Sequence, residues 1–123
     1  MMQIYETKKF KKWAAKNKIS DEKLLNAISE IDSGLGIVNL GGDLYKARIA
    51  KNKGKSGGYR TIIIYKKGFR SLFIHGYEKN DKSDISDVEK QFYKNYARDF
   101  LNYSKESIEK MLKEGEIFDL ENG

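Results

Sequence analysis

Apolar residues recur at helical spacing near the start of the chain. Phe10, Trp13 and Ala14 follow the i, i+3, i+4 pattern that places side chains on one face of a helix. A second helix is expected after Ser20, because its hydroxyl can cap the first exposed N–H groups. Gly34 is suited to ending that helix. A short turn joins the two helices, which are expected to form an antiparallel hairpin.

The middle of the chain changes to a strand pattern. A short first strand is expected at residues 3–5, before the helices. In residues 44–50 apolar and basic side chains alternate, which predicts a half-buried strand with its basic side outward. Two further strands are expected at residues 59–66 and 71–77. Three strands joined by short connections predict an antiparallel meander.

The C-terminal part is again helical. Ser86 and Glu89 have the spacing of a capping box, and the helix that follows is expected to end near Leu101. Ser104 can cap a last helix, which ends at Gly115. We expect the apolar stripes of these helices to pack in the core. The side chains expected to be largely buried are Phe10, Trp13, Leu25, Ile28, Ile63, Phe92 and Tyr96.

These elements together predict one α+β domain. The expected architecture is a small twisted antiparallel sheet with an N-terminal helical hairpin and C-terminal helices. The domain spans residues 1–114, and residues 115–123 form an acidic tail.

Charge adds a functional expectation to this fold. The chain has 123 residues, with 24 Lys and Arg against 18 Asp and Glu. From Lys46 to Tyr77 there are nine basic residues and no acidic one. Such a sheet repels itself, so an anionic partner is needed to explain it, and a polyphosphate backbone is the commonest one.

Composition excludes several classes of site. There is no cysteine and one histidine, which excludes disulfides and thiolate metal sites and disfavours a histidine metal site. No apolar run reaches membrane-spanning length, and residues 1–10 lack the apolar core of a secretion signal. We therefore expect a cytoplasmic protein with no cofactor, no metal and no membrane partner.

The glycine-rich connection before residue 59 allows more than one interpretation. Gly54-Lys55-Ser56 resembles the end of a phosphate-binding loop, but Ile49 occupies the position of the required first glycine, and a strand follows instead of a helix. We reject a phosphate-binding loop of that kind. A flexible turn, and a turn that lets Lys53 and Lys55 approach a phosphate, both remain open.

Two further residues have a structural and a functional reading. His75 lies in the third meander strand, on the face expected for Phe73 and Tyr77, and a lone strand histidine is more often structural than catalytic. Tyr59 is either a sheet aromatic or a platform for an unstacked base.

Three runs of residues make the chain similar to a known family. They are Leu40-Gly41-Gly42-Asp43-Leu44-Tyr45-Lys46-Ala47-Arg48-Ile49, Gly54-Lys55-Ser56-Gly57-Gly58-Tyr59-Arg60-Thr61-Ile62-Ile63 and Phe73-Ile74-His75-Gly76-Tyr77-Glu78-Lys79-Asn80. With the order of elements, they resemble the RelE/ParE superfamily of bacterial toxins, and most closely its RelE/HigB-type branch.

The resemblance implies a function and a set of residues. RelE-type toxins cut mRNA in the ribosomal decoding site without a metal, and a partner antitoxin neutralises them. By position, the catalytic residues are Lys46, Arg48, Arg60 and Lys79, and the RNA-binding residues are Lys53, Lys55 and Tyr59. For the tyrosine that some relatives use near the C-terminus, Tyr93, Tyr96 and Tyr103 are all open.

The chemistry of RNA self-cleavage agrees with these cations. Attack by a 2′-hydroxyl on the neighbouring phosphate gathers negative charge that fixed cations stabilise. Clustered cations lower one another's pKa, so Lys46 is a candidate base, while Arg48 or Arg60 would stabilise charge.

Two other functions remain open for this fold, and an antitoxin partner is expected. The alternatives are a ParE-like inhibitor of DNA gyrase and a non-catalytic nucleic-acid-binding module. The expected antitoxin offers an acidic, partly disordered segment that folds on contact. A helix or strand of it is expected to cover part of the basic region from Lys46 to Lys79, or to hold a helix away from that region.

Overall fold

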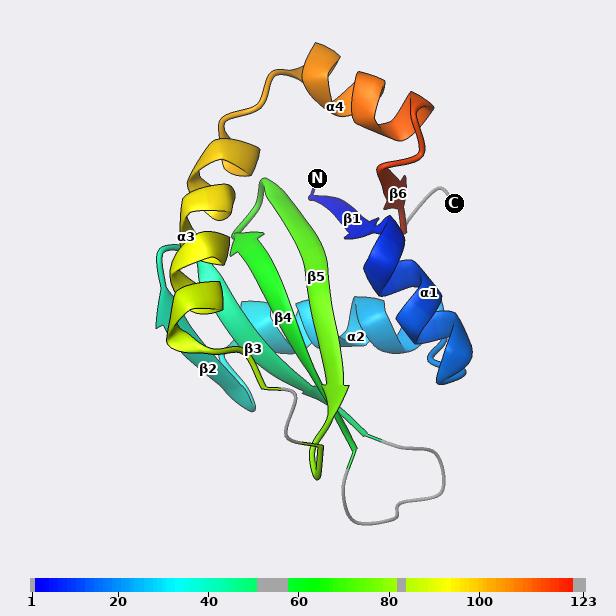
Figure 1. The fold of residues 1–123 in the computed structure, drawn as a ribbon, viewed down its shortest axis with the longest axis vertical. Helices are drawn as coiled ribbons and strands as arrows, with labels where there is room; N and C mark the ends of the chain where they lie inside the picture. Colours follow the sequence, from blue (N-terminus) through cyan, green and yellow to red (C-terminus); the bar gives the residue numbers. More distant parts are fainter. Residues whose placement is uncertain (1, 51–57, 82–83, 121–123) are drawn as a thin grey trace.

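The computed structural model describes residues 2–50, 58–81 and 84–120 and contains four helices and six strands among them (Figure 1). The elements are β1 (Gln3–Thr7), α1 (Lys8–Lys16), α2 (Asp21–Ser33), β2 (Ile37–Gly41), β3 (Leu44–Ile49), β4 (Tyr59–Lys66), β5 (Arg70–Glu78), α3 (Asp87–Leu101), α4 (Lys105–Lys113) and β6 (Ile117–Asp119).

The strands form one sheet in the order β2-β3-β4-β5-β1-β6. The antiparallel meander of β3, β4 and β5 confirms the prediction. The prediction of a wholly antiparallel sheet is wrong, because β1 pairs with β5 in parallel, with Gln3 opposite Arg70. Two strands were not predicted: β2, which pairs with β3, and β6, which joins the expected tail to β1.

Capping side chains explain where the helices begin. The side-chain oxygens of Thr7, Ser20, Ser86 and Ser104 each accept a hydrogen bond from a backbone N–H in the first turn of the helix that follows. Ser86 and Glu89 form the complete capping box. The predicted helix starts are therefore confirmed.

The first two helices follow each other through a short turn, but they do not form an antiparallel hairpin. In Figure 1, α1 descends beside β5 while α2 crosses behind the sheet. The reason lies in their partners, since α1 contacts β5 and α2 contacts β3. The two helices therefore pack on different parts of the sheet, and their axes diverge.

Each face of the sheet has its own core. On the α1/α2 face, Ala47, Ile63 and Phe73 pack with residues of α1 and α2, including Phe10 and Leu24. On the opposite side, which we call the α3 face, the cluster joins buried residues of β3, β4 and β5 to α3 and α4. Its strand and helix members include Leu44, Ile64, Leu72, Phe100 and Ile108.

The burial predictions were only partly right. Phe10, Ile28 and Ile63 are buried, at 1%, 3% and 0% exposure. Trp13, Leu25 and Tyr96 are only partly buried.

Phe92 is 64% exposed and its neighbour Val88 is 81% exposed, so the prediction that this stripe is core is wrong. The helix carries two neighbouring apolar stripes. The one through Ala97, Phe100 and Leu101 faces the sheet.

Candidate RNA-binding face

The register of β3 and β4 brings three predicted residues onto one face. Arg48 lies directly opposite Arg60, and Lys46 lies opposite Ile62. Residues paired in this way project on the same side of the sheet. Lys46, Arg48 and Arg60 therefore form one group, the cation cluster, on the α3 face.

The two arginines of the cluster form an unfavourable pair. Like charges directly opposite each other on neighbouring strands destabilise a sheet. Arg48 is exposed and Arg60 is partly buried. Among the described residues, no carboxylate lies within ion-pair distance of either guanidinium. This part of the face is therefore suited to an anionic ligand from outside.

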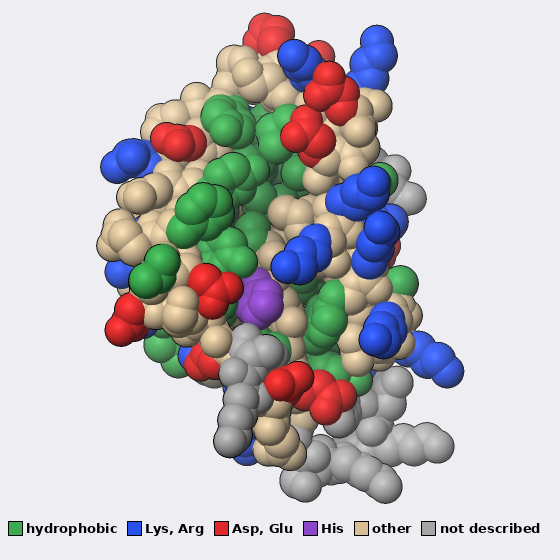
Figure 2. Space-filling model, in the orientation of Figure 1, with side chains coloured by type: hydrophobic (Ala, Val, Ile, Leu, Met, Phe, Trp, Pro, Cys, Tyr) green, Lys and Arg blue, Asp and Glu red, His purple; other side chains and the backbone are tan. Residues whose placement is uncertain are grey.

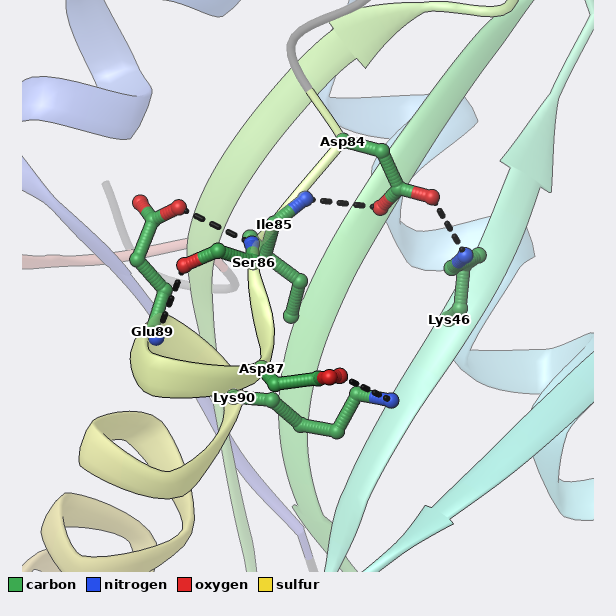
Figure 3. A network of polar contacts seen from close by, with 7 residues as sticks. All are labelled: Lys46, Asp84, Ile85, Ser86, Asp87, Glu89 and Lys90. Atoms are coloured by element: carbon green, nitrogen blue, oxygen red, sulfur yellow. Dashed lines mark hydrogen bonds and ion pairs between the residues drawn. The ribbon is translucent and has the colours of Figure 1, made fainter.

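Lys46 has an internal partner, unlike the arginines. Its Nζ lies 3.1 Å from Oδ2 of Asp84, on the segment between β5 and α3 (Figure 3). The other carboxylate oxygen of Asp84 accepts a hydrogen bond from the backbone N–H of Ile85. The positive charge that looked uncompensated in the sequence is thus partly balanced by a residue outside the basic stretch.

The contact with Asp84 changes the expected role of Lys46. Burial alone would lower the pKa of Lys46, but the interactions of Lys46 with Asp84 and Tyr77 together outweigh burial, and the pKa is raised. Burial alone would raise the pKa of Asp84, but hydrogen bonds from Lys46 and Tyr77 hold it below its usual value. The argument that neighbouring cations make Lys46 a base is therefore wrong for this structure. A protonated Lys46 is suited to donating a proton or stabilising charge.

A β-bulge decides which way His75 points. Ile62 pairs with His75 and Ile63 pairs with Phe73, so β5 contains one extra residue, Ile74. Phe73 consequently faces Phe10 on the α1/α2 face.

His75 instead joins Tyr77 on the α3 face, with 5.7 Å between their ring centroids. The prediction that His75 shares a face with Phe73 is wrong, and its place with Tyr77 is confirmed.

The remaining predicted site residues lie in different places. Lys79 is exposed in the turn after β5, and its backbone N–H donates to the Gly58 carbonyl, at the same end of the sheet as Arg60. Tyr59 makes an edge contact with Trp13, so the structure places its ring on the α1/α2 face, away from the cation cluster. Lys53 and Lys55 lie outside the described residues.

The basic stretch is also divided along the sheet. Lys66 and the turn after it lie at the opposite end of β4 from Arg60. Arg70 is 3% exposed, and its Nη1 donates to the carbonyls of Phe100 and Tyr103 at the C-terminal end of α3. A buried cation at a helix C-terminus is structural. Arg70 therefore does not belong to the binding face.

Two residues of this face, Asp84 and Tyr77, were not predicted as functional. Tyr77 could have been recognised, because it stands two residues after His75 in a strand and so shares its face. Asp84 gave no signal, since its approach to Lys46 depends on the path of the chain between β5 and α3.

Two searches of the described residues were negative. No group of three or more His, Cys, Asp or Glu side chains there is arranged to hold a metal ion. No helix in the described part of the chain has the length and apolar character needed to cross a membrane.

The sequence also matches a known protein family. Residues 2–120 match the family described as the RelE toxin of the RelE / RelB toxin-antitoxin system. The chain belongs to the RelE toxin family. None of the curated proteins matches the sequence significantly. The match covers nearly the whole chain, including β6. This protein is therefore the toxin of a toxin–antitoxin system.

Proposed function

We propose that this RelE-family chain is a cytoplasmic, ribosome-dependent endoribonuclease that cuts mRNA and arrests translation without a metal. The observation that carries the proposal is the direct pairing of Arg48 with Arg60 on an open face. A sheet accepts such a pair at a cost in stability, and a phosphate placed between the two guanidiniums would remove the repulsion.

The proposed reaction is attack of a ribose 2′-oxygen on the adjacent phosphorus. As the P–O5′ bond breaks, the 2′-proton goes to a base and the leaving 5′-oxygen takes a proton from an acid. Arg48 and Arg60 would stabilise the charge on the phosphorane oxygens, since arginine stays protonated. These side-chain cations supply the charge that a metal ion supplies in other nucleases.

The two proton-transfer roles go to two residues on the same face. Lys46 is kept protonated by Asp84 and is suited to protonating the leaving oxygen. His75 would accept the 2′-proton. Its strand position is opposite Ile62, which is itself opposite Lys46, so β4 lies between the two residues. Lys79, at the end of β5, would contact the backbone of the RNA.

The test is expression in growing cells with mapping of mRNA 5′ ends. We expect translation arrest and cuts that follow codon positions. Arg60→Ala should lower the cleavage rate by about 10²–10³-fold without destabilising the protein. The matched control is Lys66→Ala, a cation at the other end of β4, which should leave cleavage unchanged.

Other outcomes would replace the proposal. Intact mRNA together with inhibited supercoiling by purified DNA gyrase would assign the chain to gyrase inhibition instead. Binding to RNA with neither effect would make it a non-catalytic binding module.

A further inference from the structure

Helix α3 has an apolar side that is largely exposed at its N-terminal half. Val88 and Phe92 are 81% and 64% exposed, and Tyr96 continues their i, i+4 spacing along the helix. We call Val88, Phe92 and Tyr96 the α3 stripe. Figure 2 shows a band of hydrophobic side chains along α3 that continues toward α4. At the α4 end, Tyr96, Tyr103 and Met111 line a groove of about 320 Å³.

A row of lysines on α1 borders the same surface. Lys9, Lys12 and Lys16 follow i, i+3, i+7 spacing, so they share one side of the helix, and we call them the α1 lysine row. All three are exposed. Figure 2 shows Lys and Arg side chains gathered over α1, with the single histidine between them and the hydrophobic band.

The lysine row is poorly balanced by acids. Helix α1 contains no acidic residue. Lys11, on another side of the helix, pairs with Glu6 at 3.8 Å. Within the described part of the chain, no carboxylate lies within ion-pair distance of the row. Glu89 at the start of α3 interacts electrostatically with Lys9, so the first lysine of the row lies toward the start of α3.

We propose that a helix of the partner antitoxin, apolar on one side and acidic on the other, docks on the α3 stripe with its acidic side toward the α1 lysine row. The stripe spans about 12 Å along α3, at roughly 1.5 Å per residue, so a partner helix of three turns covers it. Apolar contact provides affinity, and the lysine row fixes the direction in which the acidic side points.

Charge also argues against RNA as the occupant of the stripe. Asp87 and Glu89 flank Val88 in the sequence, and both are exposed. Carboxylates beside an apolar surface repel a phosphate backbone. This docking surface is therefore distinct from the cation cluster, and the proposal stands whether or not the chain cleaves RNA.

The proposal is tested with a labelled peptide probe. The probe is a helical peptide of roughly four turns, with leucines along one side and glutamates along the other. Its affinity for the full chain is measured by fluorescence anisotropy. Val88→Ser with Phe92→Ser should weaken binding about tenfold or more. Leu35→Ser with Val38→Ser is the matched control, because these residues are 63% and 53% exposed on the β2 side.

Charge reversal gives the second arm. Changing Lys9, Lys12 and Lys16 to Glu should weaken binding of the acidic probe. The same change should strengthen binding of a second probe that has lysines in place of the glutamates. Lys66→Glu with Lys67→Glu should change neither affinity. Because Val88 and Phe92 are exposed, their serine variant should keep the wild-type melting temperature and the wild-type cleavage of mRNA.

Several results would overturn the proposal. The probe could fail to bind the wild-type chain, or it could bind all variants with equal affinity. Binding could also be lost only when Arg48 and Arg60 are changed. Self-association of the wild-type chain that disappears in the Val88→Ser, Phe92→Ser variant would assign the stripe to a second copy instead. None of these results would affect the nuclease assay, so failure here and failure of the proposed cleavage are separately visible.

Discussion

The two faces of the sheet use the same three strands for different purposes. On the α1/α2 face, Ala47, Ile63 and Phe73 are fully or almost fully buried. On the α3 face, the strands are buried at one end, at Leu44 and Ile64, and carry Arg48 and Arg60 at the other. The same alternation in the strands thus gives a closed core on the α1/α2 face and, on the α3 face, a core that ends at Arg48 and Arg60.

A large loss of stability is expected when a buried side chain on the α1/α2 face is truncated, but not when an arginine on the α3 face is. Phe73→Ala should destabilise the fold by about 3–5 kcal/mol, because it removes a fully buried ring that packs on Phe10. Arg48→Ala, on the open part of the other face, should not lower stability. Urea unfolding of both variants checks this. Equal losses would show that the arginine pair is structural.

A substitution at Gly76 shows how tightly the α1/α2 face is packed. A Cβ at this position would lie 2.3 Å from the Trp13 ring. Gly76→Ala should therefore cost about 1–3 kcal/mol through overpacking. Adding Trp13→Leu should recover part of the loss in a double-mutant cycle of thermal unfolding. Additive effects would mean that the ring is not what restricts position 76.

Glu6 is a buried carboxylate beside the core of the α1/α2 face, and its titration should make the stability of the fold depend on pH. Burial raises its pKa from 4.5 to about 7, with Lys11 opposing the shift and Asp21 adding to it. The folded state then binds more protons than the unfolded state between these values. Stability should fall as pH rises from about 4.5 to about 7 and stay level above that.

Replacing Glu6 should remove this slope. Glu6→Gln should be more stable than wild type near pH 8, by on the order of 1–3 kcal/mol, in melting curves recorded across the pH range. Glu109→Gln, on the exposed side of α4, is the control and should keep the wild-type slope. A wild-type stability that rises from about pH 4.5 to 7 would contradict the account of Glu6.

The smallest expected effect concerns the pair between Lys46 and Asp84. The Asp84 side chain is 50% exposed, so Asp84→Asn should change stability by less than about 1 kcal/mol. It should tighten binding of a short RNA by up to about fivefold, because Lys46 no longer has a competing carboxylate. Filter binding measures this, with Asp81→Asn as control. Weaker binding would show that Asp84 positions Lys46 for RNA.

Local signals in the sequence were sufficient for most elements. Hydroxyl caps fix the helix starts, and alternation in β3 separates Lys46 and Arg48 from Ala47 and Ile49. Lys46 and Arg48 could be placed on one side because a strand's period of two needs no knowledge of distant contacts. Arg60 joins them through the pairing of β3 with β4.

The features that could not be predicted depend on the rest of the fold. One bulged residue, Ile74, turns His75 away from the face of Phe73, and no local pattern marks it. Phe92 has the spacing of a core residue, but α3 has room for only one of its two stripes on the sheet. The parallel pairing of β1 links distant segments, which periodicity does not encode.

That parallel pairing has a consequence for the order of assembly during synthesis. Strand β1 is translated first, yet its partner residue Arg70 is 67 positions later than Gln3, and β6 comes later still. Until those segments leave the ribosome, β1 has no strand beside it, and α1 lacks its main packing partner, β5. Such non-local closure slows folding. We therefore expect the nascent toxin to remain unfinished until most of its chain has been made.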